Sequence, residues 1–491
     1  MPDDEPREPR PSALVSDHPA PLNTLAEIFD RRKIAVGIDS SGHVVLARPD
    51  ALLAEIETVE QRESLARYVE RYDKEQADRV RRPTDIEKRL PFVTVRLPGV
   101  ERGLINGEDR WTLTPVQHAI RELAALQPPV EAELNHVFLG APAVKGNPLG
   151  APASWAGEIA FLGNVVSTKP DAHGVVHKVM LSTAEPAEEP RFLRRRLNIE
   201  GRRRPQILVL DTGLRTVEDS GTRRPEHKFL DCCIVHAAWR DAVPQANGRI
   251  PIDDEDEPDD DATGTLDFEG GHGTFIAGVI AQICPDADVH TSGVLSSFGD
   301  GDVADVIAGL QGGLAASTSP IDLVVMSFGA FFADDDPGIF GTSLLQLLDK
   351  RLGIAASGNQ ATCRPYFPAG LADVKGVGAV AASGRAWFSN FGGWVDACAP
   401  GVDVVSTFFG FSEDLDLFPA LDHVTPREYT GWATWSGTSF SAPKVAAVLA
   451  QEMYLNLNSA GSDLITAEEA WRRLTTHDHL RMPDLGVVFN A

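Results

Sequence analysis

Residues 206–213 read Gln-Ile-Leu-Val-Leu-Asp-Thr-Gly, an apolar run that ends in a carboxylate and a glycine. The four large apolar residues 207–210 predict a strand that is buried on both faces. Asp211 follows at the carboxyl end of this strand, and Gly213 permits a sharp turn of the chain. Functional sites of open α/β sheets assemble at the carboxyl ends of the strands. The stretch therefore predicts Asp211 at a functional sheet edge, although strand-Asp-x-Gly alone is also typical of an ordinary turn.

The chain beyond this strand alternates between strand-like and helical apolar runs. This alternation predicts the α/β class, with a doubly wound, mostly parallel sheet that carries helices on both faces. The sequence contains no internal repeat that would favour a solenoid. The runs are 206–210, 275–283, 288–294, 302–316, 321–327, 342–352, 353–357, 374–382 and 440–453.

Two candidate catalytic residues of this region, a base and a nucleophile, each stand at the start of a predicted helix. His272 stands among the glycines of 270–274, Gly-Gly-His-Gly-Thr, directly before an apolar helix. Ser439 stands in 437–443, Gly-Thr-Ser-Phe-Ser-Ala-Pro, also at a helix start, where backbone N–H groups favour a developing oxyanion. Taken alone, His272 could also be a structural histidine in an apolar setting, although the glycines around it favour a functional one. Ser439 alone is also typical of an ordinary N-cap, and Ser441 suits that role equally.

A side-chain amide completes the set of polar groups. Asn359 ends the apolar run 355–359, Ala-Ala-Ser-Gly-Asn, and its amide is suited to donate a hydrogen bond to an oxyanion. Asn after Gly is also a commonplace turn. Taken together, however, Asp211, His272 and Ser439 follow one another in one of the three known chain orders of a hydrolytic triad, at spacings of 61 and 167 residues.

In these motifs the chain resembles the subtilisin-like serine proteases (the subtilases, peptidase family S8), over about residues 204–491. Three signatures carry the resemblance: Asp211-Thr-Gly, His272-Gly-Thr and Gly437-Thr-Ser-x-Ser-Ala-Pro443. The turn at 399–401, Ala-Pro-Gly, also resembles the family pattern. Two positions depart from that pattern, since Phe440 replaces the usual Met and Ser357 replaces the usual Ala. Neither change removes a polar catalytic group.

The resemblance implies a serine endopeptidase that forms an acyl-enzyme intermediate. Ser439 is then the nucleophile, His272 the general base and acid, and Asp211 the residue that orients the imidazole. Asn359 is implied as an oxyanion-hole donor. Ser327, Phe328 and Gly329 resemble the segment that aligns the substrate, which is expected to bind as an added strand.

An acidic run of eight carboxylates lies just ahead of His272, at 253–261. A calcium site that uses Asp253, Asp256, Asp259 and Asp261 is one interpretation, because Ca²⁺ prefers several oxygen ligands and the family often binds it. The spacing does not fit an EF-hand loop. A solvated insertion and a surface that selects basic substrates remain the other two interpretations, and no cofactor is required by the chemistry.

The N-terminal half shows a second, smaller α/β region. We expect a disordered tail at 1–24, an α/β regulatory domain or pro-region at 25–190, an Arg-rich linker at 191–204 and the peptidase domain at 205–491. Within the N-terminal region, the patterns predict an amphipathic helix over 49–79, strands at 92–97 and 130–139, and a helix over 114–126. Docking of the Arg-rich linker onto the acidic run is a further expectation, one that high salt should weaken.

The amino-acid composition restricts the kinds of partner that the protein is expected to bind. The 491 residues carry 45 basic and 71 acidic side chains, a formal net charge of −26. This balance disfavours nucleic acid and a polybasic membrane anchor, and no stretch of 18 apolar residues predicts a membrane helix. Five cysteines without a C-x-x-C pair and a polar N-terminus without a signal sequence favour a reducing cytoplasm.

Two other kinds of function compete with a constitutive endopeptidase. The first is a partner-gated regulatory protein in which the N-terminal region binds a protein partner and the protease is the output. The second is an esterase with the same triad, which is disfavoured because the Gly-x-Ser-x-Gly elbow is absent around Ser439. The expected substrate in the leading interpretation is a polypeptide.

Overall fold

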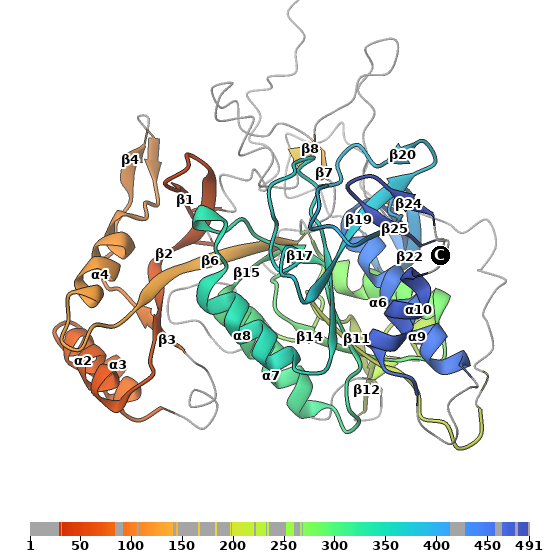
Figure 1. Ribbon diagram of the computed structural model, residues 1–491, viewed down its shortest axis with the longest axis horizontal. Coiled ribbons are helices and arrows are strands. Elements are labelled where there is room, and N and C mark those ends of the chain that lie inside the picture. The colour runs from red at the N-terminus through yellow and green to blue at the C-terminus, as the bar shows by residue number, and fades with distance from the viewer. Residues whose placement is uncertain are drawn as a thin grey trace, which may run out of the picture.

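The computed structural model describes residues 29–140 and 197–489, except for 31, 84–91, 106–107, 198, 220–221, 232, 235–251, 260–265, 268, 413–427, 457–463 and 477–479. It also describes the short strands β7 (Val144–Lys145), β8 (Val165–Val166) and β9 (Ser182–Thr183). An N-terminal part and a larger C-terminal part lie side by side (Figure 1). The tail predicted at 1–24 lies outside the described residues. None of the helices within these ranges is both long and apolar enough to cross a membrane.

The C-terminal part is built on one mostly parallel sheet. The strand that opens it, β10 (Gln206–Asp211), lies between β14 (Asp288–Gly293) and β16 (Leu323–Met326), and both pairs are parallel. This order confirms the doubly wound α/β class. The complete order is β13 (Cys233–Ile234), β14, β10, β16, β18 (Leu352–Ala356), β19 (Val374–Ala381), β21 (Ala397–Pro400), β25 (Gly486–Val488) and β24 (Arg481–Met482), in which only the last pair is antiparallel.

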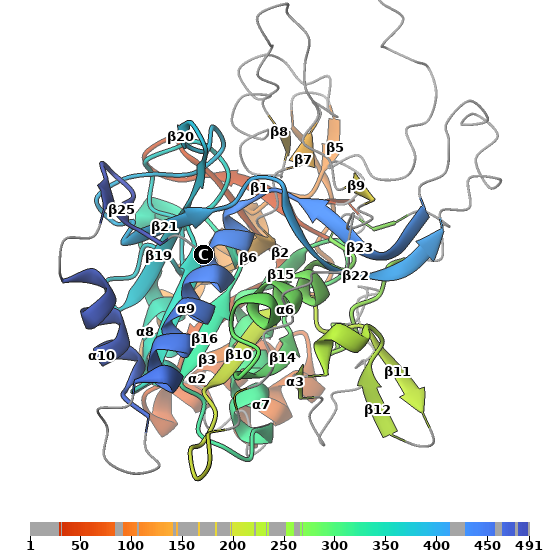
Figure 2. The same cartoon turned by 90° about the vertical axis from the view of Figure 1, so that its right-hand side faces the viewer.

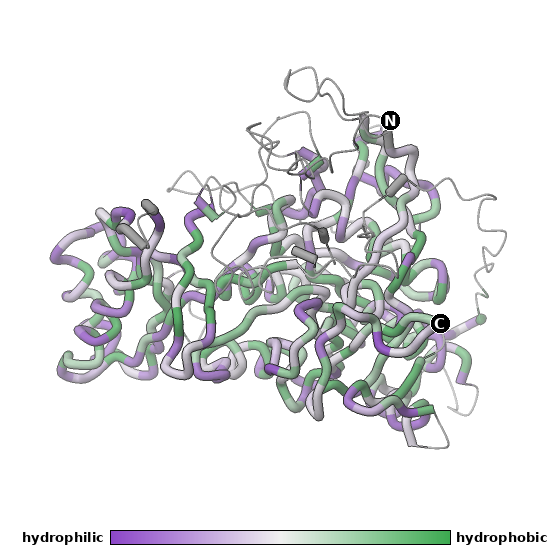
Figure 3. The backbone as a smooth tube through the Cα atoms, turned by 90° about the horizontal axis from the view of Figure 1, so that it is seen from above, coloured by the Kyte–Doolittle hydropathy of each residue, from purple (hydrophilic) through white to green (hydrophobic). Residues whose placement is uncertain are grey.

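Helices cover both faces of this sheet because successive side chains of a strand point to opposite sides. Ile207 and Val209 pack toward α6 (His272–Ile283) and α9 (Ser441–Leu455), which stands in front of the strands in Figure 2. Leu208 and Leu210 pack toward α7 (Val303–Ala316) and α8 (Gly338–Leu348). Hydrophobic backbone segments accordingly gather in the interior, and hydrophilic ones lie mainly at turns and outer helices (Figure 3).

Smaller elements extend the C-terminal part around this sheet. A long antiparallel ribbon packs on α6, and β9 adds to its edge. A second hairpin follows the strand that opens the sheet. The remaining elements are β22 (Val404–Ser412) and β23 (Glu428–Trp435) of the ribbon, β11 (Thr216–Asp219) and β12 (Thr222–Pro225) of the hairpin, β20 (Gly384–Arg385), α10 (Ala467–Thr475) and the 3-10 turns η2 (Lys228–Leu230), η3 (Ala333–Asp335) and η5 (Thr438–Phe440).

The N-terminal part is an antiparallel sheet with helices packed on it. The predicted strand at 92–97, helix at 114–126 and strand at 130–139 are confirmed. The predicted helix over 49–79 is wrong over 49–55, because those residues complete a twelve-residue strand. The elements are β1 (Ala35–Ile38), β2 (Val44–Glu55), α2 (Val59–Glu70), α3 (Lys74–Arg81), β3 (Phe92–Arg96), β4 (Gly103–Ile105), β5 (Glu108–Arg110), α4 (Thr114–Ala124) and β6 (Ala132–Gly140).

The error over 49–55 has a physical cause. Ala51, Leu52, Leu53 and Ala54 form a continuous apolar run, which suits a buried strand as well as a buried helix. Pairing with β3 on one side and β6 on the other decides in favour of the strand. The helix then begins at Val59, where Thr58 caps it in a reciprocal arrangement with Gln61.

Strand β6 joins the two parts. In Figure 1 it runs as one long strand out of the N-terminal part and ends among strands of the C-terminal part. Its Phe138 is fully buried and packs against Phe328 and Phe340, with the ring centroids of Phe138 and Phe340 4.7 Å apart. The two parts therefore share one hydrophobic core at this point. Aromatic burial of this kind contributes about a few kcal/mol to the stability of the fold.

A buried ion-pair cluster, which we call the latch, also fixes the N-terminal part to the C-terminal part. Arg48 donates from Nη2 to Asp300 at 2.9 Å and from Nε to Asp302 at 3.1 Å. Arg32 donates to the other oxygen of Asp300 at 2.5 Å. All four side chains are at most 4% exposed. These charges tolerate burial only while their partners remain in place.

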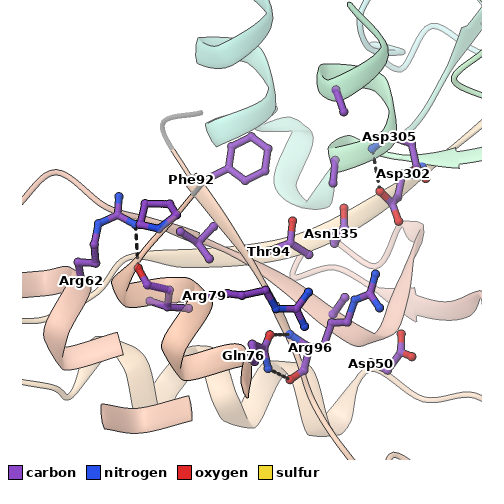
Figure 4. Close-up of a pocket in the computed structure, with 16 residues that line it drawn as sticks. Asp50, Arg62, Gln76, Arg79, Phe92, Thr94, Arg96, Asn135, Asp302 and Asp305 are labelled. Atoms are coloured by element: carbon purple, nitrogen blue, oxygen red, sulfur yellow. Dashed lines mark hydrogen bonds between the residues drawn. The ribbon is translucent and has the colours of Figure 1, made fainter. Parts of the chain in front are cut away.

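A pocket of about 310 Å³ lies at the same seam, between α3 and the start of α7. Figure 4 shows Arg79 and Arg96 extending side by side on its N-terminal wall, opposite Asp302 and Asp305. Gln76 fixes the backbone of Arg96 through two hydrogen bonds of 2.7 and 3.0 Å. The seam is therefore polar here, in contrast to the aromatic packing around Phe138.

The Arg-rich junction does not dock on the acidic run, at least over the arginines that the structure describes there. Arg203 pairs with Asp322 at 2.6 Å and Arg204 with Asp288 at 3.5 Å, next to the amino ends of β14 and β16. The acidic run lies at the opposite, carboxyl edge of the sheet, because Asp254 accepts from the backbone of Gly293 at the end of β14. The docking expectation is wrong for these residues.

Candidate active site

Asp211 ends β10 and is 1% exposed. The turn after it depends on Gly213, whose φ of +106° is unfavourable for other residues. A Cβ there would also lie 2.5 Å from the backbone oxygen of Asp254. The Thr212 N–H donates to one Asp211 oxygen at 2.9 Å. The turn thus holds the carboxylate at the sheet edge.

His272 is the first residue of α6 and is fully buried. Its Nδ1 lies 2.7 Å from Oδ1 of Asp211, which is a short hydrogen bond between the two predicted catalytic residues. The imidazole packs beside two aromatic side chains, Trp435 and Phe440, with ring centroids 5.4 Å away in each case. Phe440, which departs from the family pattern, therefore forms a wall against the imidazole.

Asp256 ties the Asp211 turn to the start of α6. One of its oxygens accepts from the Thr212 hydroxyl and from the Gly271 N–H, both at 2.9 Å. The other accepts from the N–H and the hydroxyl of Thr274, at 2.9 and 2.6 Å. Complete burial raises the pKa of Asp256 to about 6. These four donors make Asp256 a structural anchor of the site.

Replacing Asp256 by alanine should lower the free energy of unfolding by about 3 kcal/mol, because four buried donors lose their acceptor. Chemical denaturation in a Ser439→Ala background, which excludes self-cleavage, measures the change. Glu257→Ala in the same run removes a half-exposed pairing with Arg215 and should change stability by under about 1 kcal/mol. Equal effects of the two substitutions would contradict the anchoring role.

The residues of the calcium interpretation do not converge on one point among those the structure describes. Asp256 accepts from N–H and O–H donors, and Asp253 accepts from the N–H of Glu255 at 2.8 Å. Within the described part of the chain, no group of three or more His, Cys, Asp or Glu residues could hold a metal ion. Asp261 lies outside that part.

Ser439 lies in the 3-10 turn η5, immediately before α9, and is fully buried. Its Oγ donates to the backbone oxygen of Ser327 at 3.1 Å, and the Ser327 hydroxyl donates back to the Ser439 oxygen at 2.8 Å. The Nε2 atom of His272 has no hydrogen-bond partner among the described residues. The structure thus brings Asp211 to His272, while the Ser439 hydroxyl bonds to the Ser327 oxygen and makes no hydrogen bond to Nε2 of the imidazole.

The amide of Asn359 is fixed through its oxygen. Thr438 donates to Oδ1 of Asn359 twice, from its N–H and from its hydroxyl, each at 2.9 Å. The residue before Ser439 therefore positions the predicted oxyanion donor, and Nδ2 is the donor end of the same side chain. Ser357, the second departure from the family pattern, is buried behind this turn with its hydroxyl near the oxygen of Asn390 at 3.4 Å.

The predicted substrate-aligning segment is occupied by this chain itself. Strand β17 (Phe328–Gly329) pairs antiparallel with β6, so that Gly329 lies opposite Leu139 and Phe328 opposite Gly140. The other edge of β6 pairs antiparallel with β15 (Asp300–Asp302). Strand β6 is therefore the middle strand of three, on the segment that the sequence predicts to align the substrate, and Asp211, His272 and Ser439 are each at most 1% exposed.

A second carboxylate lies beside the imidazole. An oxygen of Glu269 is 3.5 Å from Nδ1 of His272, and Glu269 is fully buried. Burial lowers the pKa of His272, but the charges of Asp211 and Glu269 outweigh that effect and raise this pKa to about 9. The only signal for Glu269 in the sequence is its place three residues before His272. Nothing in the sequence indicates that Trp435 packs against the imidazole.

The charge of Glu269 predicts the pH dependence of the site. The imidazole accepts a proton only when it is neutral, so the rate should rise with pH through about 9. Because the folded pKa exceeds the ordinary 6.5, protonated His272 stabilises the fold below pH 6.5, and this contribution is lost as pH rises through 9. Glu269→Gln should move the acid limb of kcat/KM to lower pH. An unmoved limb in a pH–rate profile would contradict the assignment.

Comparison with known proteins shows the family of this chain. The model of the subtilase family matches residues 202–479, more than half of the chain. The chain belongs to the subtilase family.

Its relatives cover only part of this subtilase. Alkaline elastase YaB from Bacillus sp. (strain YaB) is 30% identical over 195 residues, 37% of this chain and 44% of that protein. Cerevisin from Saccharomyces cerevisiae is 31% identical over 244 residues, 46% of this chain and 34% of that protein. The chain spans less than half the length of these relatives. A solved cold-adapted subtilisin-like serine proteinase is 22% identical with a TM-score of 0.40, over 59% of this chain and 88% of that one.

Proposed function

We propose that this subtilase is a serine endopeptidase whose nucleophile is Ser439. The observation that carries the proposal is the 2.7 Å bond between Asp211 and His272, made at the sheet edge where Ser439 lies in the 3-10 turn just before α9. A carboxylate that fixes Nδ1 leaves Nε2 as the basic atom, which is the arrangement that a triad needs. The names of the relatives, an alkaline elastase and a thermostable alkaline protease among them, support peptide hydrolysis.

In the first half of the reaction, the Ser439 hydroxyl rotates from the Ser327 oxygen toward His272. Its oxygen attacks the peptide carbonyl carbon while Nε2 takes the proton, and the carbonyl oxygen becomes an oxyanion. Asn359 and the Ser439 N–H are the proposed donors to that oxyanion, and loss of one such donor typically costs about 2.7–4 kcal/mol. The C–N bond then breaks as His272 returns the proton to the leaving amine.

In the second half, water hydrolyses the acyl-enzyme. His272 takes a proton from the water, whose oxygen attacks the ester carbon, and then gives this proton back to the Ser439 oxygen as the new carboxyl group leaves. The charge of Asp211 stabilises the imidazolium that forms in both halves. No cofactor takes part in these steps.

Two roles of the N-terminal part are compatible with the pairing of its strand β6 with β17. A pro-region would be cut off by the enzyme itself, whereas a regulatory domain would stay attached and move. Mass spectrometry of the purified full chain and of Ser439→Ala distinguishes them. Loss of about 200 N-terminal residues from the active form alone supports a pro-region, and an intact chain in both supports a regulatory domain.

A partner-gated protein is the second candidate function, and the insertion of β6 between β15 and β17 favours it. A partner that binds the N-terminal part more tightly in its displaced position would open the site. Casein hydrolysis by the full chain tests this gating. Immediate turnover without any partner argues against it, and a lag that ends in N-terminal cleavage supports self-processing.

Two expectations from the sequence stay predictions. A calcium requirement would appear as a rise of the melting temperature in Ca²⁺ over that in a chelator. A cytoplasmic location would appear on cell fractionation.

A further inference from the structure

One contact in the closed site bears on which substrates it accepts. The Cα of Gly140, the last residue of β6, lies directly against Glu269. A Cβ built on Gly140 would come within 2.1 Å of one carboxylate oxygen of Glu269 and 2.4 Å of the other. Gly299 also lies against the same side chain, since a Cβ on Gly299 would lie 2.4 Å from Cγ of Glu269. The carboxylate thus fills the space where a side chain at position 140 would begin.

The register of β6 tells which substrate residue would take that position. Leu139 lies opposite Gly329 and Gly140 opposite Phe328, and the N–H of Gly140 donates to the Gly299 oxygen at 2.8 Å. A peptide in the same register would place its next residue opposite Ser327, whose carbonyl oxygen contacts the hydroxyl of Ser439. The carbonyl attacked is then that of this next residue. The residue that replaces Gly140 is therefore the second residue before the cut.

We propose that Glu269 makes this site select a lysine or arginine as the second residue before the cut, an inference that rests on the proposed endopeptidase function. Any side chain there must displace the carboxylate, and the rotatable bonds of the glutamate side chain allow its end to shift. An uncharged side chain would give the displaced, buried carboxylate no cationic partner, and an acidic one would add repulsion. A cation would instead form a charge-assisted hydrogen bond with it.

Two features of the chain are consistent with such a selection. Gly140 lacks the side chain that the position recognises, so β6 fills the channel without the contact that a good substrate would make. The net charge of −26 would in addition attract basic peptides to the enzyme. Glycine at position 140 is thus suited to an occupant that must be displaced by the substrate.

The test is a set of five peptides that differ only in the second residue before the cut: Arg, Lys, Gln, Glu and Gly. The full chain and its Arg48→Ala variant are assayed, and mass spectrometry reads the position of the cut. The fraction of molecules in which β6 has left the site affects every peptide equally. It therefore cancels in the ratio of kcat/KM between two peptides. We expect Arg and Lys to exceed Gln by about tenfold or more, and Glu to be the poorest.

Variants assign this preference to Glu269. Glu269→Gln should reduce the Arg-to-Gln ratio to near one, Glu269→Asp should keep most of it, and Glu257→Gln should leave it unchanged. Equal cleavage of Arg and Gln peptides by the wild type would overturn the inference while the endopeptidase function stands, and so would a preference for glycine alone. If neither enzyme cuts any of the five peptides, the proposed function itself fails.

Discussion

Arg48→Ala is expected to raise the peptidase activity of the full chain at least about tenfold. Arg48 contacts both Asp300 and Asp302 of β15, and all three side chains are buried in the closed arrangement. Removing one partner from a buried ion pair costs about 3–5 kcal/mol, because the remaining charge stays out of water. When the N-terminal part moves away, the two carboxylates regain water, so the penalty falls on the closed state alone.

The size of the effect follows from the equilibrium between closed and open molecules. Each 1.4 kcal/mol changes that ratio about tenfold. The full penalty therefore permits an increase in peptidase activity of about two to three orders of magnitude. Arg32→Ala, which removes one contact to Asp300, should act in the same direction with a smaller effect. Arg121→Ala, on the exposed surface of α4, is the matched control and should leave the activity unchanged. Unaltered activity in Arg48→Ala would show that the latch does not hold the closed state.

Ser439→Ala is expected to reduce kcat by about 10⁵-fold or more and to prevent any N-terminal shortening of the chain. Residues of a triad act as a unit, so His272→Ala should have a similar effect and the double variant should be no slower than either single one. Ser441→Ala is the control, because that hydroxyl donates to the Ala399 oxygen at 2.9 Å and lies outside the proposed triad. Multiplicative losses in the double variant would contradict a shared mechanism.

Local patterns in the sequence were sufficient to predict the α/β sheet and its functional edge. The run Ile207–Leu210 forms an interior strand of the sheet, and Asp211 lies at its carboxyl end beside His272. These residues are predictable because strand burial, a glycine turn and a helix start are each encoded within a few residues. The identity of the nucleophile remains a proposal, since the Ser439 hydroxyl contacts Ser327 in the closed state.

Long-range contacts account for what the sequence could not predict. The sequence around Arg48 does not indicate its ion-pair partners, which lie 252 and 254 residues further along the chain. The strand at 132–140 was predictable, but its pairing with Phe328 and Gly329 depends on how two folded parts meet. The helix expected at 49–55 failed for the same reason, because neighbouring strands decide the conformation of an apolar run that suits either structure.

The role of Asp256 illustrates a similar limit at the site. Its place in a run of carboxylates suggested a cation ligand, whereas the structure surrounds it with the donors of Thr212, Gly271 and Thr274. The sequence shows how many carboxylates are close along the chain. It does not show which of them turns inward, since that depends on the N–H groups that the fold leaves without acceptors.

The central claim is that Ser439 is the nucleophile of a peptidase whose substrate channel is closed by β6. Its most direct test is the rate at which a fluorophosphonate, which reacts with activated serines, labels the full chain and its Arg48→Ala variant. Peptide mapping should locate the label on Ser439 in both proteins, with slow labelling of the wild type and faster labelling of the variant. Labelling of a different residue, or an equal rate in both proteins, would contradict this account.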